Sequence, residues 1–237
     1  MSVCEIWSKR SAGVVLLLAA LSACAAPAVP EDPASPADLP AETVAEAPPT
    51  DSQPTARPGE FVTFRFDPSA TEVRFVIGEI LGGAPNTVIG VNDQVSGEIL
   101  INASNPGASQ IGAIEIAADG FATDNNLRNR AINQFVLQSG SFPVITFTPT
   151  SIAGIPDEVS PGAVLTLQIE GDLTIREVTQ PVSFEATITV ISENEIKGTA
   201  AATIARSDFE LTIPSVPRVA GVDEHLLLEL DFIARSE

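Results

Sequence analysis

The stretch GDLTIREVTQPVSFE, residues 171–185, alternates apolar and polar side chains on both sides of a polar middle. The alternation continues upstream to residue 164 and downstream to residue 190. Because successive side chains of a β-strand point to opposite faces, a period of two gives a strand one apolar and one polar face. The stretch therefore predicts two neighbouring, half-buried strands joined at Arg176 and Glu177.

Period-two runs separated by turn residues predict more strands along the chain. These candidates are residues 61–66, 71–81, 87–92, 94–102, 111–118, 143–150, 195–205 and 226–232. Residues 123–138 instead have apolar side chains at roughly helical spacing, with Thr123 or Asp124 as the expected N-cap. Such antiparallel strands fit either a closed barrel or a sandwich. We expect a mainly β fold class, an antiparallel β-barrel of about eight strands with one short helix, because a closed barrel has no exposed edges.

Composition excludes several kinds of function. The formal net charge of −19 argues against binding to nucleic acid or to an anionic membrane surface. The only histidine, His225, has two acidic neighbours, but this spacing is poor for a metal site. We therefore expect no enzyme, no metal and no cofactor. A glycosidase with paired carboxylates is the enzyme alternative, but most acids fall on outward strand faces, in loops or near the N-terminus.

The N-terminus has the organisation of a secretory signal peptide. Lys9 and Arg10 form its positive region. Residues 13–21 form its apolar region, which is shorter than the roughly 20 residues that span a bilayer. The sequence LSAC at residues 21–24 resembles the bacterial lipobox, and this resemblance implies cleavage before Cys24 and lipid on that cysteine.

Cleavage at this point divides the chain into three parts. Residues 1–23 are the signal peptide, residues 24–58 are the lipidated cysteine with a disordered tether, and residues 59–237 are the barrel domain. After the cysteine, the tether holds nine of the 19 prolines and a single base, so it cannot bury enough apolar surface to fold.

A lipidated cysteine predicts an extracytoplasmic, membrane-anchored lipoprotein of a bacterium. Ala25 follows the cysteine, and a residue other than Asp there favours the outer membrane where a bacterium has two membranes. An ordinary signal peptidase site at Ala23 or Ala26 is the alternative, with Cys24 incidental.

The strand at residues 195–205 has mostly small side chains on one face, which leave room on that wall of a barrel. An eight-stranded barrel is about the size that holds one small ligand. The alternative is that the small side chains only let another element pack close. The expected ligand-lining residues of this strand and its neighbours are Leu165, Leu167, Ile169, Val182, Phe184, Ala186, Ile188, Gly198, Ala200, Ala202, Leu228 and Leu230.

Four stretches between roughly residues 60 and 235 resemble motifs of the YceI-like family, in the family's order. GDLTIREVTQPV at 171–182 is similar to its G-x-L-T-I-x-G-V-T-x-P-V hairpin, and FPVITF at 142–147 to its F-P-x-I-x-F strand. RSDF at 206–209 resembles its R-x-D-F-G segment, and residues 123–130 resemble the T-x-n…R-D start of its helix. Glu177 and Glu210 depart from these motifs, because the family usually has glycine there.

The resemblance implies an extended, lipocalin-like barrel that binds a long isoprenoid, such as a polyprenyl chain or the tail of an isoprenoid quinone. Each buried carbon contributes roughly 0.8 kcal/mol before the costs of association, so a few isoprene units suffice for micromolar binding. The expected role is carriage, storage or delivery of the isoprenoid lipid, with a membrane redox protein as the partner for delivery. A surface structural or adhesion β-domain with a filled core is the alternative.

Arg128, Arg130, Arg206 and Asp208 are the candidate contacts for a polar head group. The first two lie at the start of the expected helix, where a guanidinium at a barrel mouth can meet a phosphate or quinone oxygen. A solvated helix face is their alternative. Arg206 and Asp208 are two residues apart, so in a strand they share a face and can pair. The alternative to a head-group site is that this pair, or hydrogen bonds of these residues, fix the loop before Pro214.

Overall fold

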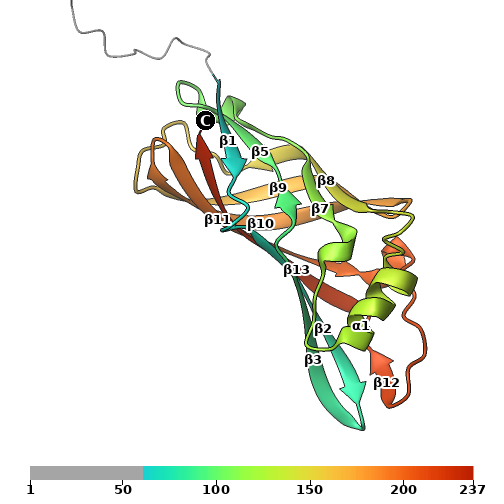
Figure 1. Ribbon diagram of the computed structural model, residues 1–237. Coiled ribbons are helices and arrows are strands. Elements are labelled where there is room, and N and C mark those ends of the chain that lie inside the picture. The colour runs from blue at the N-terminus through green and yellow to red at the C-terminus, as the bar shows by residue number, and fades with distance from the viewer. Residues whose placement is uncertain (1–60, 237) are drawn as a thin grey trace, which may run out of the picture. The chain divides into compact units, whose positions relative to one another are not determined.

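The computed structural model describes residues 61–236 (Figure 1). In this range the strands form one antiparallel sheet, and the mainly β fold class is confirmed. The strands are β1 Phe61–Phe66, β2 Glu72–Leu81, β3 Ala84–Asn92, β4 Val95–Ser96, β5 Glu98–Asn102, β6 Gln110–Ile111, β7 Ile114–Ala117, β8 Val144–Ala153, β9 Val164–Ile175, β10 Val178–Ser192, β11 Glu195–Ala205, β12 Val219–Val222 and β13 His225–Ser236. The predicted signal peptide, Cys24 and the tether lie outside the described residues.

One half of the barrel is closed by backbone hydrogen bonds. The strand order is β4-β7-β8-β9-β10-β11-β13-β1-β5-β6. β4 and β5 stand near opposite ends of this path, but in the chain only Gly97 separates them. The Gly97 carbonyl also accepts a hydrogen bond from the Phe66 amide at 3.1 Å. Residues 95–102 therefore join the two sides of the curled sheet, and we call this part the closed half.

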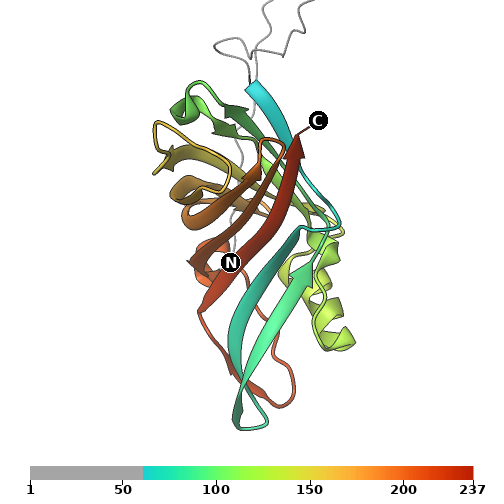
Figure 2. The ribbon, with the colours of Figure 1, turned by 90° about the vertical axis from the view of Figure 1, so that its left-hand side faces the viewer.

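The other half is not closed by strands. β13 pairs with β1 only through residues 234–236, whereas residues 227–231 pair with β2. β2 then pairs with β3 and β12, and this group extends the sheet away from the closed half (Figure 2). Between β7 and β8 the chain forms helix α1, Asn126–Ala131, and a π-helical turn, Ile132–Val136. We call this part, where the helix takes the place of strands, the open half (Figure 1).

The hairpin predicted from residues 171–185 is present. β9 and β10 pair along twelve positions, from Val178 with Ile175 to Thr189 with Val164. Arg176 and Glu177 form the two-residue turn, and Arg176 adopts a left-handed φ of +57°. Along both strands buried or half-buried apolar side chains alternate with exposed polar ones, as the period of two predicts.

The helix differs from the prediction at its start. Its N-cap is Asn125, whose side chain accepts hydrogen bonds from the amides of Leu127 and Arg128. The expected caps were Thr123 and Asp124. Thr123 instead donates its amide and hydroxyl to the Asn129 side chain, so it fixes the chain before the helix. The sequence offers several capping residue types in succession, and the hydrogen bonds of Thr123 to Asn129 leave the cap to Asn125.

Candidate functional site

The predicted lining residues all lie on the inward face of the sheet, where each is buried or half-buried. Ala202 pairs with Leu228 of β13, and Ala200 pairs with Ala186 and Leu230 on either side. The small face of β11 is thus part of the interior wall. Contact of these residues with a ligand stays a prediction.

The interior of the closed half is filled by aromatic rings. Phe66 and Phe232 stack with centroids 4.7 Å apart, and both are buried. A Cβ at Gly198 would lie 2.4 Å from the Phe232 ring and 2.6 Å from Ile188, so these side chains occupy the room that the glycine leaves. At Gly198 the small residue lets a neighbouring strand's ring pack close, as the alternative reading of this face expected.

The interior of the open half is apolar but less completely covered. Several apolar side chains there pack on the buried core and keep part of their surface accessible. They are Phe121, Ile132, Val136, Val178, Val182, Phe184, Leu226 and Leu228. Half-buried side chains such as Leu165 also occur at the opposite rim. In the open half, however, the half-buried apolar side chains lie beside a short helix and not beside a paired strand.

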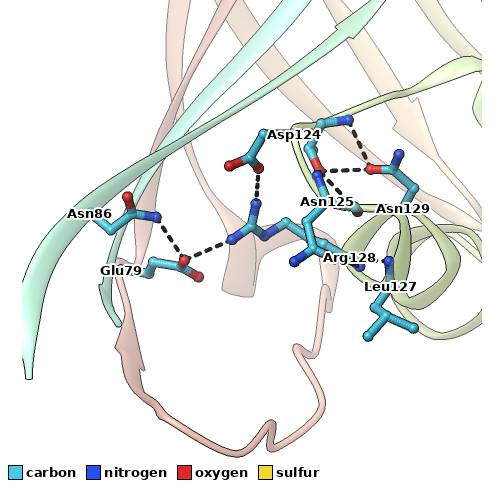
Figure 3. Close-up of polar contacts among 8 residues, drawn as sticks. Glu79, Asn86, Asp124, Asn125, Leu127, Arg128 and Asn129 are labelled. Atoms are coloured by element: carbon cyan, nitrogen blue, oxygen red, sulfur yellow. Dashed lines mark hydrogen bonds and ion pairs between the residues drawn. The ribbon is translucent and has the colours of Figure 1, made fainter. Parts of the chain in front are cut away.

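Helix α1 is tied to the sheet by an ion pair on the inward side (Figure 3). Arg128 Nη2 donates to Glu79 Oε1 at 2.9 Å, and Asn86 Nδ2 donates to the same oxygen at 2.9 Å. The Glu79 side chain is only 6% exposed and that of Arg128 19% exposed. Arg128 also pairs with Asp124 one turn earlier. A half-buried guanidinium between two carboxylates joins helix and hairpin, and we call this cluster the latch.

Sequence analysis did not single out Glu79. It stands on the face of β2 that Val73, Phe75 and Ile77 share, and an acid in an otherwise apolar inward pattern was the available signal. Its partners lie seven and 49 residues away in the chain, so no local pattern predicted the pairing. Such a carboxylate requires a partner, because an unpaired buried charge is costly.

Arg206 and Asp208 do not pair as expected. The expectation assumed a strand, but residues 206–209 form a 3₁₀ turn, in which side chains two apart point in different directions. Arg206 instead pairs with Glu224 at 3.2 Å and donates to the carbonyls of Asp223 and Leu211. These bonds fix the loop before Pro214, which was the alternative reading. Asp208 is exposed.

The candidate head-group residues are therefore on two separate elements. Arg128 is engaged in the latch, and Arg130 is exposed on the helix. A further arginine, Arg176, connects the two elements. Its guanidinium donates to the carbonyl of Val136 at 3.3 Å and to that of Glu210 at 3.4 Å. The turn of the β9–β10 hairpin thus holds the π-helical turn and the 3₁₀ turn together at the end of the barrel.

Two carboxylates in the described residues have lowered pKa values. Hydrogen bonds from Ser207 hold the pKa of Glu224 below its ordinary 4.5, and the Arg206 charge acts in the same direction. Hydrogen bonds from Ser69 lower the pKa of Asp67 from 3.8, and Arg235 adds to this. Both carboxylates hold turns in place.

Two hollows of the described surface have linings that are mostly outward-facing. One, of about 360 Å³, lies against the outer faces of β9 to β11 and β13 and includes Glu185 and Thr199. The other, of about 530 Å³, lies at the edge formed by β4 and β7 and includes Asp93 and Glu115. Within residues 61–236 no group of three or more His, Cys, Asp or Glu side chains is placed to hold a metal ion. No helix in the same range is long and apolar enough to cross a membrane.

Known structures share this fold at low sequence identity. A polyisoprenoid-binding domain from Saccharophagus degradans matches with a TM-score of 0.58 and 14% identity, over 75% of this chain and 100% of that domain. BcnA of Burkholderia cenocepacia matches with a TM-score of 0.56 and 15% identity, over 71% of this chain and 98% of BcnA. A YceI protein of Campylobacter jejuni matches with a TM-score of 0.50 and 20% identity, over 62% of this chain and 84% of that protein.

The search of curated proteins found no match. The model of the YceI-like domain matches residues 64–234, which is well over half of the 237 residues and covers nearly the whole sheet. The four motifs quoted above lie within this range, and the resemblance that they indicated is confirmed. The chain belongs to the YceI-like family.

Proposed function

We propose that this chain binds a long isoprenoid lipid, a polyprenyl chain or an isoprenoid quinone, with its apolar tail in the open half of the barrel. The observation that carries the proposal is the group of partly accessible, inward apolar side chains beside α1. Such a surface suits a flexible hydrocarbon chain, since each isoprene unit contributes roughly 3 to 4 kcal/mol before ordering costs. The Saccharophagus degradans domain of the same fold is a polyisoprenoid-binding domain, which supports this ligand class.

Access to this interior requires the latch to open. The two hollows described above are on the outer surface, so a tail that enters the barrel displaces side chains or the helix that covers them. α1 has only six residues, and the Arg128–Glu79 pair connects it to β2. Segments held by few contacts open at lower free energy than the sheet to which they are attached. The helix is therefore the element that moves when lipid enters.

The proposed setting is extracytoplasmic. Lipid on Cys24 anchors the chain in a bacterial membrane, by preference the outer one, and the domain carries, stores or delivers its ligand from there. Delivery brings it to a membrane redox protein when the ligand is a quinone. The protein acts as a binding protein and not as an enzyme. Mass spectrometry of the N-terminal peptide from the native membrane fraction tests the anchor, because an acylated Cys24 has a higher mass than a free cysteine.

Native mass spectrometry of the purified protein, followed by organic extraction, tests the ligand. We expect an isoprenoid in near-stoichiometric amount. The Ala202→Phe variant should lose it, because Ala202 is 6% exposed and faces Leu228 in the open half. Ala201→Phe is the matched control, since the neighbouring side chain lines the outer hollow. A protein that holds no lipid and refuses added quinone and polyprenol would contradict the proposal.

The alternative of a structural or adhesion domain is favoured by one observation, the Phe66–Phe232 stack that fills the closed half. If side chains fill the open half to the same extent in solution, the Ala202→Phe and Ala201→Phe variants should have the same lipid content as the wild type. A folded Ala202→Phe protein with unchanged lipid content would show that the tail lies elsewhere.

A further inference from the structure

The open half ends in a protruding tip that the lipid-binding proposal does not use. It consists of residues 80–91, around the turn between β2 and β3, and residues 212–222, which include β12 (Figure 1). We call it the distal tip. Val219 pairs with Leu81, and the Gly82 amide donates to the Arg218 carbonyl at 2.7 Å, so the two segments form one unit. β1, the first described strand, lies at the opposite end of the barrel (Figure 2).

The distal tip is nearly free of charge. Residues 80–91 contain no Asp, Glu, Lys or Arg, and residues 212–222 contain only Arg218. The chain as a whole has a formal net charge of −19 and 18% charged residues. Within these two segments there is one cation and no acid, and the exposed Asp223 directly follows the second segment.

The distal tip also exposes aliphatic side chains. Ile80 and Leu81 are each 38% exposed, Ile89 is 48% exposed and Val216 is 42% exposed. Leu127 of α1 is 72% exposed, and it points away from the latch in Figure 3. Its neighbour Arg128 binds Glu79, the residue before Ile80, so the helix adds an apolar side chain close to the tip. Exposed apolar side chains gathered at one end of a domain mark a candidate site of interaction.

We propose that the distal tip docks onto a lipid bilayer. Aliphatic side chains with a single arginine suit the interface between acyl chains and head groups, where an apolar face is buried and a cation meets phosphate. An acid near that surface is repelled by anionic lipids, and the tip has none. The acidic body stays in water, which orients the barrel with its open half toward the membrane.

A protein partner or a second copy of the chain fits this surface less well. Protein interfaces depend on aromatic and arginine anchors that fill pockets, and they bury about 800 Å² on each partner. The distal tip offers small aliphatic side chains on a protruding hairpin, and both described hollows lie elsewhere. A bilayer has no pockets to match and accepts a protruding apolar tip.

Hydrogen exchange with and without vesicles of phosphatidylcholine tests the docking. The full chain is used with Cys24→Ser in every arm, so that no acyl chain is attached. We expect slower exchange in residues 80–91 and 212–222 and no change in residues 98–102 of the closed half. Leu81→Asp with Val216→Asp should remove the protection and lower the vesicle partition coefficient roughly tenfold, because two half-exposed apolar side chains are lost.

The matched control is Val164→Asp with Ile191→Asp, which changes two exposed apolar side chains at the closed end. This pair should leave partition and protection unchanged. Equal loss in both pairs, or no protection of the tip in vesicle-bound protein, would overturn the proposal. So would a dimer, detected by sedimentation without lipid, that the tip variant abolishes. These outcomes are independent of whether the purified protein contains isoprenoid, so this proposal and the ligand proposal fail separately.

Discussion

The two halves of this barrel are closed in different ways. In the closed half, residues 95–102 complete a continuous ladder of backbone hydrogen bonds, and stacked rings of Phe66 and Phe232 fill the centre. In the open half, a six-residue helix covers the gap between β3 and β8 and is held by side chains, chiefly Arg128 and Glu79. A ladder opens only when many bonds break together, whereas a side-chain closure opens locally. The fold therefore combines a rigid end with an end that can admit a ligand.

The largest effect that tests this difference is the removal of an aromatic ring from each half. Phe232→Ala removes a ring that is 5% exposed and stacked on Phe66, and we expect it to lower the free energy of unfolding by about 4 kcal/mol. Phe75→Ala removes a half-buried ring that contacts Phe121, with centroids 5.6 Å apart, and should cost about 2 kcal/mol. Urea unfolding followed by circular dichroism measures both.

Equal losses in the two variants would contradict the distinction between a packed and a loosely covered half. If Phe232→Ala does not fold, Phe232→Leu provides the same comparison with a smaller loss of about 1 kcal/mol. Phe75→Leu is its counterpart in the open half.

Breaking the latch should have the next largest effect. Arg128→Met leaves the Glu79 carboxylate, which is 6% exposed, with Asn86 as its described partner, and we expect a loss of about 3 kcal/mol. Hydrogen exchange should rise in residues 126–136 and stay unchanged in β9 and β10. Arg130→Met, on the exposed side of the same helix, should change stability by less than about 0.5 kcal/mol.

The double variant Glu79→Gln with Arg128→Met should recover part of this stability, because it removes the unpaired charge. A single Arg128→Met variant with wild-type exchange in the helix would show that the apolar contacts of Ile132 and Val136 hold the helix without the ion pair.

The sequence predicted the parts of the fold that depend on local pattern. The period of two located β9 and β11 at their observed bounds, and the turn at Arg176 and Glu177 was evident from its polar residues. β12 was missed, because its four residues, VAGV, have no alternation. The closure through Gly97 was not predicted either, because residues 94–102 were expected as one strand but pair with different strands before and after the glycine.

The candidate site was predictable only in its apolar part. Inward positions such as Ala202 and Leu228 follow from alternation once the barrel is assumed. The latch does not follow, because Glu79 and Arg128 are 49 residues apart and meet only after both elements have folded. The Phe232 ring beside Gly198 was not predictable either, because it comes from another strand.

A smaller effect is expected from two of the left-handed residues of the open half, Glu210 and Arg176. Glu210 has a φ of +52° at the end of the 3₁₀ turn, a conformation that costs a residue with a Cβ more than it costs glycine. Glu210→Gly should therefore raise the free energy of unfolding by up to about 1 kcal/mol. Arg176→Gly relieves the same strain at +57° but loses the hydrogen bonds to Val136 and Glu210, so it should destabilise. Thermal unfolding of the two variants measures both effects. A gain of stability in both would show that the Arg176 hydrogen bonds do not hold the two turns together.

The smallest effect concerns pH and compares one carboxylate from each half. The pKa of Glu224 in the folded protein lies below its ordinary 4.5, so its contribution to stability is present above that pH and is lost as pH falls through the lowered value. Glu224→Gln should unfold at a lower temperature than the wild type near neutral pH, and the difference should disappear in acid. Asp67→Asn should also unfold at a lower temperature than the wild type near neutral pH. Here the difference should disappear at a lower pH, because the pKa of Asp67 is lowered from an ordinary value of 3.8. Protection of the 3₁₀ turn at residues 206–209 should fall in the Glu224 variant alone, since the Ser207 amide donates to that carboxylate at 2.9 Å. If both variants loosen the same turn, the two halves are coupled more tightly than their separate modes of closure imply.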